Sequence, residues 1–199
     1  MVTLFFWFVK RVFRFFFWIN GWKVDRNLPP EFNRSVMIAA PHTSNRDFIY
    51  MIAALDICGL DVRYTIKKEL IDTPLKYILL PLGAIPIDRS PKKPGEKRPS
   101  LVEAMANLFD EHEKLIVAVT PEGTRSLRTQ WKTGFYHVAK IAKVPIALGY
   151  LDFKNKKAGV GGIIEPSGDM DADMRKITAF YKEKTAMYPE KYSVDERYL

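Results

Sequence analysis

The sequence predicts a single α/β domain with a largely parallel central sheet, preceded by an amphipathic helix at the N-terminus. The chain has 199 residues, which is enough for one substantial core and too few for two large domains. Apolar residues make up 47% and charged residues 27%, so the chain as a whole is not expected to be disordered. Short apolar runs alternate with helical patterns, which is typical of parallel strands joined by helices. We therefore expect residues 1–24 to form the helix and residues 25–199 the domain.

The N-terminal helix is expected to lie in a membrane interface. Residues 4–19 read LFFWFVKRVFRFFFWI, which is too short and too interrupted by charge for a span of about 20 apolar residues. No basic segment precedes the run and no small-residue cleavage site follows it, so a signal peptide is not expected. At about 100° per residue, Lys10, Arg11 and Arg14 fall within an arc of about 100°. Such a helix would bury its aromatic face in lipid and turn its cations to headgroups, with Trp22 at the same level. The alternative is a helix packed on the domain's own core.

After a polar connector at residues 25–34, apolar runs predict strands and periodic segments predict helices. Gly59 ends one helix, Pro74 opens another, and Ser100 with Glu103 forms a capping box. The third strand contains a proline, which places it at an edge or a strand end. The predicted strands are residues 35–40, 62–66, 84–87, 115–119 and 145–150, with 115–119 central. The predicted helices are residues 46–60, 73–82, 100–113, 133–143 and 171–187, and residues 90–99 form a loop.

A histidine and an aspartate lie where the first predicted strand of the domain meets its first helix. The segment from Pro41 to Asp47 reads PHTSNRD, and α/β sheets bind ligands at such junctions. With His42 on the loop and Asp47 in the first helical turn, the carboxylate could reach the imidazole and stabilise its charge, as in a catalytic dyad. Two alternatives stay open. Asp47 can complete a capping box with Ser44, and His42 can be an ordinary hydrogen-bonded loop histidine.

A second polar segment follows the most apolar strand. Residues 119–126 read VTPEGTRS. Gly123 permits close backbone approach, and Arg125 offers a planar fork for phosphate or carboxylate. The segment therefore predicts a polar pocket at the carboxyl end of the strand. The alternative is an ordinary loop with an internal pair between Glu122 and Arg125.

A third segment, residues 83–90, reads GAIPIDRS and ends another strand in a charged pair. This position would place Arg89 where a phosphate could bind. The alternative is a surface ion pair between Asp88 and Arg89, which would contribute little to stability.

Together these segments resemble the glycerolipid acyltransferase family, which includes the 1-acyl-glycerol-3-phosphate acyltransferases. The stretch from His42 to Asp47 resembles the family's His-x4-Asp block, and residues 83–89 and 121–126 resemble its second and third blocks. Residues 144–146 resemble the fourth, hydrophobic block. The resemblance spans residues 35–150, and the Pro-Glu-Gly-Thr-Arg sequence about 80 residues after the histidine makes it specific. Pro41 departs from the asparagine of many members, and the fourth block lacks a second proline.

The resemblance implies an O-acyltransferase of phospholipid biosynthesis. It would move a fatty acyl chain from acyl-CoA or acyl carrier protein to the free hydroxyl of a lyso-lipid, with 1-acyl-glycerol-3-phosphate as the expected acceptor. His42 would be the general base and Asp47 its partner. The residues implied in substrate binding are Arg89, Glu122, Gly123, Thr124 and Arg125. No cofactor and no metal ion are expected.

The net charge of +8 favours anionic partners. We expect the partners to be an anionic membrane surface, the lyso-lipid, and acyl-CoA or acyl carrier protein. Nucleic acid is not expected, because basic residues without a nucleic-acid motif are weak evidence. The expected location is the cytoplasmic face of a membrane, as a peripheral or monotopic protein. Two alternatives are acylation of a different, for example amino-acid-headed, lyso-lipid and a non-enzymatic membrane-binding protein. A hydrolase is not expected, because the chain has no Gly-x-Ser-x-Gly sequence.

Overall fold

A computed structural model of the chain describes residues 2–26, 28–29, 32–87 and 99–199. The strands are β1 (Lys23–Arg26), β2 (Arg34–Ala40), β3 (Val62–Lys67), β4 (Ala84–Ile87), β5 (Leu115–Val119), β6 (Ile146–Asp152) and β7 (Lys157–Ile164). The helices are α1 (Val2–Ile19), α2 (Arg46–Cys58), α3 (Lys76–Leu79), α4 (Leu101–Glu111), α5 (Gly134–Ala142) and α6 (Met170–Lys182). Short 3₁₀ turns lie at Lys68–Asp72, Pro189–Lys191 and Glu196–Tyr198.

The described strands form one seven-stranded sheet in the order β1-β7-β6-β2-β5-β3-β4. Neighbouring strands are parallel except for β6 and β7, which are antiparallel. The predicted α/β fold with a largely parallel sheet is therefore confirmed. The strand at β5 lies inside the sheet, and the proline-containing strand β4 lies at its edge, both as expected.

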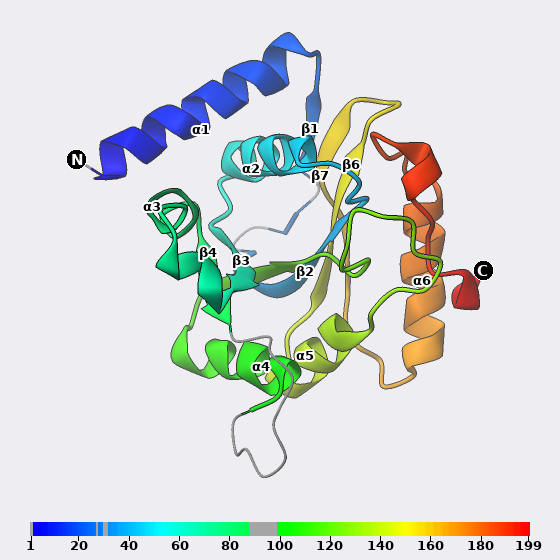
Figure 1. The fold of residues 1–199 in the computed structure, drawn as a ribbon. Helices are drawn as coiled ribbons and strands as arrows, with labels where there is room; N and C mark the ends of the chain where they lie inside the picture. The colour runs from blue at the N-terminus through cyan, green and yellow to red at the C-terminus, as the bar shows by residue number, and fades with distance from the viewer. Residues whose placement is uncertain (1, 27, 30–31, 88–98) are drawn as a thin grey trace.

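Helices cover both faces of this sheet (Figure 1). α4, α5 and α6 pack on one face, in a core that includes Val36 and Ile38 of β2. α1 and α2 pack on the other face, in a core that includes Met37. Because successive side chains of a strand point to opposite faces, one strand supplies both cores. This burial on both sides explains why the strands of the parallel part read as continuous apolar runs.

Two strands have no counterpart in the sequence prediction. β1 lies in the segment expected to be a polar connector, and β7 reads KAGVGGII. Glycine has little strand propensity, so β7 gives a weak signal. A glycine is nevertheless required there. A side chain at Gly159, where φ is +144°, would place its Cβ 2.2 Å from the backbone oxygen of Asp25 in β1.

Two predicted helices are shorter in the structure. The helix expected at residues 73–82 is reduced to the single turn α3. The helix expected at residues 171–187 ends at Lys182. Beyond it the chain turns to the β6–β7 hairpin, where the Thr185 oxygen accepts a hydrogen bond from the Phe153 N–H at 2.9 Å. The loop expected at residues 90–99 lies almost wholly outside the described residues.

The expected arrangement of α1 is corrected in part. Lys10 and Arg14 do not face outward, since they pair with Asp56 of α2 at 3.2 and 2.6 Å. Phe17 is buried against α2, and Trp22 is only 7% exposed and stacks on Tyr50 with a ring distance of 4.6 Å. One face of α1 therefore packs on the domain.

The opposite face of α1 remains exposed. Trp7, Phe15 and Trp18 are each more than half accessible to solvent, and the guanidinium of Arg11 lies 4.9 Å from the centre of the Trp7 ring. These residues recur every three or four positions, so they share one side of the helix. Within the described ranges, none of the helices combines the length and apolar character that crossing a membrane would require.

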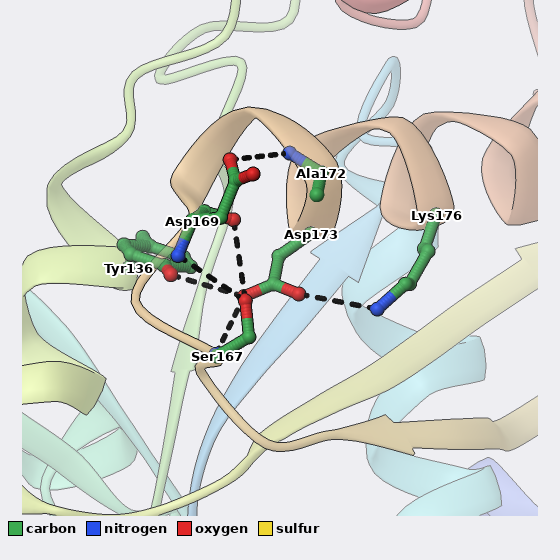
Figure 2. A network of polar contacts seen from close by, with 6 residues as sticks. All are labelled: Tyr136, Ser167, Asp169, Ala172, Asp173 and Lys176. Atoms are coloured by element: carbon green, nitrogen blue, oxygen red, sulfur yellow. Dashed lines mark hydrogen bonds and ion pairs between the residues drawn. The ribbon is translucent and has the colours of Figure 1, made fainter.

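The start of α6 is fixed by a buried aspartate, shown in Figure 2. One oxygen of Asp173 accepts hydrogen bonds from the backbone N–H and hydroxyl of Ser167 and from the hydroxyl of Tyr136 on α5, at 2.7 to 3.0 Å. Lys176 lies 3.4 Å from the other oxygen. Burial alone raises the pKa of Asp173, but these hydrogen bonds outweigh it and hold the pKa below its ordinary value. The network ties α6 to α5 and so sets where the chain beyond α6 can go.

Candidate active site

The sheet brings two distant loops together. β2 and β5 are parallel neighbours, and Ile38 pairs with Val119 near their carboxyl ends. The loops that follow neighbouring parallel strands begin side by side at the same edge of the sheet. His42 follows β2 and Glu122 follows β5, so two blocks about 80 residues apart in the sequence meet at this edge.

His42 and Asp47 face each other as their positions predicted. His42 lies on the loop, Asp47 lies in the first turn of α2, and the imidazole Nδ1 is 3.6 Å from the carboxylate Oδ2. That distance is an ion-pair contact and is too long for a hydrogen bond. Catalytic hydrogen bonds are often this loose before substrate binds. Within the described part of the chain, the other ring nitrogen, Nε2, has no hydrogen-bond partner.

Asp47 also holds the loop that carries the histidine. Its Oδ2 accepts the backbone N–H groups of Thr43 and Ser44 at 2.7 and 2.8 Å, and only 3% of the residue is exposed. The capping box proposed as an alternative is only half formed, because the Ser44 hydroxyl accepts from the Arg46 N–H at 3.1 Å. The same carboxylate therefore stabilises the loop and contacts the imidazole. The two sequence interpretations of Asp47 are compatible.

Glu122 supports His42 from the other side. Both of its carboxyl oxygens accept the backbone N–H of His42, at 3.0 and 3.2 Å, and only 4% of the residue is exposed. The internal pair with Arg125, considered as an alternative, is not formed among the described residues. Burial raises the pKa of Glu122 to about 8, the His42 N–H lowers it, and the charge of Asp47 raises it further. At neutral pH Glu122 is therefore mostly protonated.

This pKa predicts a pH dependence of stability. Glu122 binds a proton more tightly in the folded chain, with a pKa near 8 against the ordinary 4.5. Its favourable contribution is complete below about pH 4.5 and is lost as pH rises through about 8. The Glu122→Gln variant does not titrate there, so its free energy of unfolding should gain a few kcal/mol relative to the unmodified protein between these pH values. Urea denaturation from pH 5 to 9 measures this difference.

A matched control for this prediction is Glu183→Gln, because the side chain of Glu183 is 79% exposed. This variant should follow the pH profile of the unmodified protein. If Glu122→Gln follows it as well, Glu122 does not titrate as its burial requires.

The loop after Glu122 turns sharply and presents Arg125. Gly123 has a φ of +68°, and a Cβ there would lie 3.0 Å from the end of the Lys132 side chain. The hydroxyl of Thr124 accepts the Ser126 N–H at 3.3 Å, which shapes the turn. Arg125 itself is exposed and forms no ion pair with any described residue. Arg89, the other arginine singled out from the sequence, lies outside the described residues.

An open cavity of about 440 Å³ lies between the histidine loop and the Arg125 loop. It borders the residues that follow His42 in the chain. Its described lining is Thr43, Ser44, Asn45, Arg125, Ser126, Leu127, Tyr188 and Lys191. The lining combines polar and apolar surface in similar amounts. It carries two cationic side chains and no carboxylate among the residues described, which suits an anionic ligand.

Sequence reasoning missed Tyr188 and Lys191, which reach this cavity from the end of the chain. They lie after the last predicted strand and outside the segments that resemble a family. No short motif marks them, so only the three-dimensional fold could bring them to the site.

Comparison with known proteins supports the interpretation of the loops. A family model described as acyltransferase matches residues 23–147, well over half of the chain. The match starts at β1 and ends within β6, so it includes both the His42 and the Glu122 loops. It leaves out α1, β7, α6 and the C-terminal segment. No curated protein matches the chain at a significant level.

Proposed function

The chain belongs to the acyltransferase family, and on this basis we propose that it transfers a fatty acyl chain from acyl-CoA or acyl carrier protein to the free hydroxyl of a lyso-lipid. The family supports acyl transfer in lipid biosynthesis in general. The acceptor that we propose is 1-acyl-glycerol-3-phosphate. The contact between His42 and Asp47, beside a cationic cavity, is the observation that carries this proposal.

In the proposed reaction, Nε2 of His42 takes the proton of the acceptor hydroxyl. The oxygen attacks the carbonyl carbon of the thioester, the carbon–sulfur bond breaks, and the thiolate leaves and recovers the proton from the imidazolium. Asp47, on the Nδ1 side, favours the tautomer with a free Nε2 lone pair and stabilises the imidazolium. Base catalysis of this kind contributes about 10²–10⁴-fold, and positioning adds more. The reaction uses no metal or cofactor.

The acceptor phosphate is proposed to lie against Arg125. Its guanidinium lines the cavity and has no carboxylate partner in the described chain. A planar guanidinium can donate two parallel hydrogen bonds to a phosphate. The proposed binding role of Gly123 and Thr124 is to shape this turn, and Arg89 remains a second candidate for the same phosphate.

Thiol release from acyl-CoA and from acyl carrier protein, measured with a panel of lyso-lipids, tests the proposal. The panel includes a phosphomonoester, a zwitterionic and an amino-acid-headed lyso-lipid. We expect the fastest release with 1-acyl-glycerol-3-phosphate. Release with another acceptor alone would keep the reaction and replace the acceptor. No release with any of them would favour a non-enzymatic membrane-binding protein.

We further propose that the exposed face of α1 docks the protein on the cytoplasmic face of a membrane as a peripheral protein. Each large apolar side chain buried contributes about 1.5–3 kcal/mol, and Arg11 adds about 1 kcal/mol against anionic lipid. The apolar side chains Leu75, Tyr77 and Ile78 around α3 are also exposed. Pro81, which follows α3, lines one small cavity with Lys10 of α1, so the end of α3 lies near α1.

Replacing Trp7, Phe15 and Trp18 together by serine should move the protein from anionic vesicles to the supernatant, because several kcal/mol of apolar contact is lost. Vesicle sedimentation measures this shift. High salt should weaken the binding of the unmodified protein only in part, since the apolar contribution is not screened. Deletion of residues 1–20 is a poorer test, because it removes the buried Phe17 and the contacts with Asp56.

The control for docking is a double replacement of Leu101 and Ile141 by serine, on the helices of the opposite face of the sheet. This variant also loses exposed apolar side chains, although they are fewer and smaller than those replaced on α1. It should still sediment with vesicles. If the α1 variant sediments equally well, α1 is not the docking face.

A further inference from the structure

We propose that the C-terminal segment, residues 183–199, completes the acceptor site, and that Lys191 acts as a second cation which selects a phosphomonoester headgroup. The inference rests on the proposed transfer to a lyso-lipid. It concerns residues outside the family match at 23–147.

Two cations from distant parts of the chain face one cavity. Arg125 comes from the loop after β5, and Lys191 comes from the 3₁₀ turn at Pro189–Lys191. Neither has a carboxylate partner among the described residues, and the described cavity lining contains no acidic side chain. Two positive charges that share one cavity without a counter-charge in its described lining create a field that favours a multivalent anion.

The segment that carries Lys191 is packed against the domain by hydrogen bonds and an ion pair. Asp195 is fully buried, accepts the Trp131 N–H at 3.2 Å and pairs with Arg197 at 2.7 Å. Arg197 also donates to the Trp131 backbone oxygen at 2.8 Å. The indole N–H of Trp131 donates to the Ser193 backbone oxygen at 3.0 Å. These contacts hold the segment against the loop between β5 and α5, which carries Glu122 and Arg125.

The same segment also contacts the histidine loop. The backbone N–H of Tyr188 donates to the hydroxyl of Thr43 at 3.3 Å, one residue after His42. The Lys191 ammonium lies 4.7 Å from the centre of the Tyr188 ring, and both residues line the cavity. The C-terminal segment thus contacts both the histidine loop and the loop that carries Arg125.

This arrangement explains a preference among acceptors. A phosphomonoester carries between one and two negative charges near neutral pH, as a phosphorylated side chain does, and its oxygens can accept from both Arg125 and Lys191. A zwitterionic or amino-acid-headed lyso-lipid offers a weaker match to two cations. Lys191 is therefore a specificity-determining residue that adds to the contribution of Arg125.

The test compares Lys191→Ala and Lys191→Arg with Lys182→Ala, a control lysine that is exposed on α6 and absent from the cavity lining. Steady-state kinetics give KM and kcat for the phosphomonoester acceptor, a phosphate-free acceptor and the thioester. Isothermal titration with glycerol 3-phosphate, and in parallel with inorganic phosphate, measures anion binding without any need for turnover.

Lys191→Ala should raise the KM for the phosphomonoester acceptor about 3- to 20-fold and weaken glycerol 3-phosphate binding to a similar degree. The kcat, the thioester KM and the KM for the phosphate-free acceptor should stay unchanged, and Lys191→Arg should retain most of the affinity. Lys182→Ala should match the unmodified protein in every measurement.

Two results would overturn the proposal. They are no change in acceptor KM or glycerol 3-phosphate affinity in Lys191→Ala, and a rise in the thioester KM alone. The second result would assign the cavity to the phosphates of coenzyme A. If no lyso-lipid is acylated at all, the proposed function fails, while the glycerol 3-phosphate titration still decides the role of Lys191.

Discussion

Replacing His42 by alanine is expected to abolish acyl transfer, with kcat falling about 10³-fold or more. The imidazole of His42 lies 3.6 Å from the carboxylate of Asp47, on the loop whose next residues line the cavity. General base catalysis contributes about 10²–10⁴-fold, and the neighbouring carboxyl groups of Asp47 and Glu122 are both engaged with backbone N–H groups. Thiol release under saturating substrates measures the loss.

The His42→Ala protein should keep its thermal melting temperature, since the contacts of Asp47 with Thr43 and Ser44 do not use the imidazole. His137→Ala is the matched control. His137 is exposed on α5 and should be replaceable without effect. Added imidazole should restore part of the activity of His42→Ala. It should not change the activity of His137→Ala, which is expected to equal that of the unmodified protein. Near-normal turnover by His42→Ala would remove the proposed base.

Asp47→Asn should lower kcat less than His42→Ala, because the imidazole remains and loses only its charged partner. This substitution should also lower the melting temperature, unlike the histidine change. The carboxylate of Asp47 accepts hydrogen bonds from two backbone N–H groups in a buried site, and the amide of asparagine is a weaker acceptor. The two variants therefore separate the catalytic contact of Asp47 from its structural one.

The sequence predicted best the part of the site whose residues lie close together in the chain. A loop histidine followed by an aspartate in the first helical turn is a local arrangement, and the structure has it. The meeting of His42 with Glu122 needed one further assumption, that the two apolar strands are parallel neighbours. The sequence indicated a polar pocket after β5, yet gave no sign that Glu122 would hold the His42 backbone instead of pairing with Arg125.

Other features depend on contacts that leave no local pattern. Lys10 and Arg14 look like headgroup-binding residues on an isolated helix, but Asp56 of α2 draws them inward. Trp22 looks interfacial, yet it fills a pocket beside Tyr50. The glycines of β7 give it a weak strand signal in the sequence, yet Gly159 is needed because the backbone of β1 lies too close for a side chain there. In each case a tertiary contact overrides the propensity that a single segment shows.

The second large effect is expected at Arg125. Arg125→Ala should raise the KM for a phosphate-bearing acceptor roughly 10–150-fold, because one charge-assisted contact of about 1.5–3 kcal/mol is lost. The thioester KM should move little, since the proposed contact is with the acceptor. Arg125→Lys should restore only part of the affinity, because a point charge replaces a bidentate contact.

The control for Arg125 lies on the same loop. Arg128 is exposed and absent from the cavity lining, so Arg128→Ala changes the net charge equally and should leave the acceptor KM unchanged. Steady-state kinetics of both variants with phosphate-bearing and phosphate-free acceptors distinguish a direct contact between Arg125 and the phosphate from an effect of the protein's net charge. If Arg125→Ala affects both acceptor types alike, Arg125 does not bind the phosphate. The proposed chemistry at His42 and Asp47 would still stand in that case, because it depends on the β2 loop and not on the charge of the acceptor.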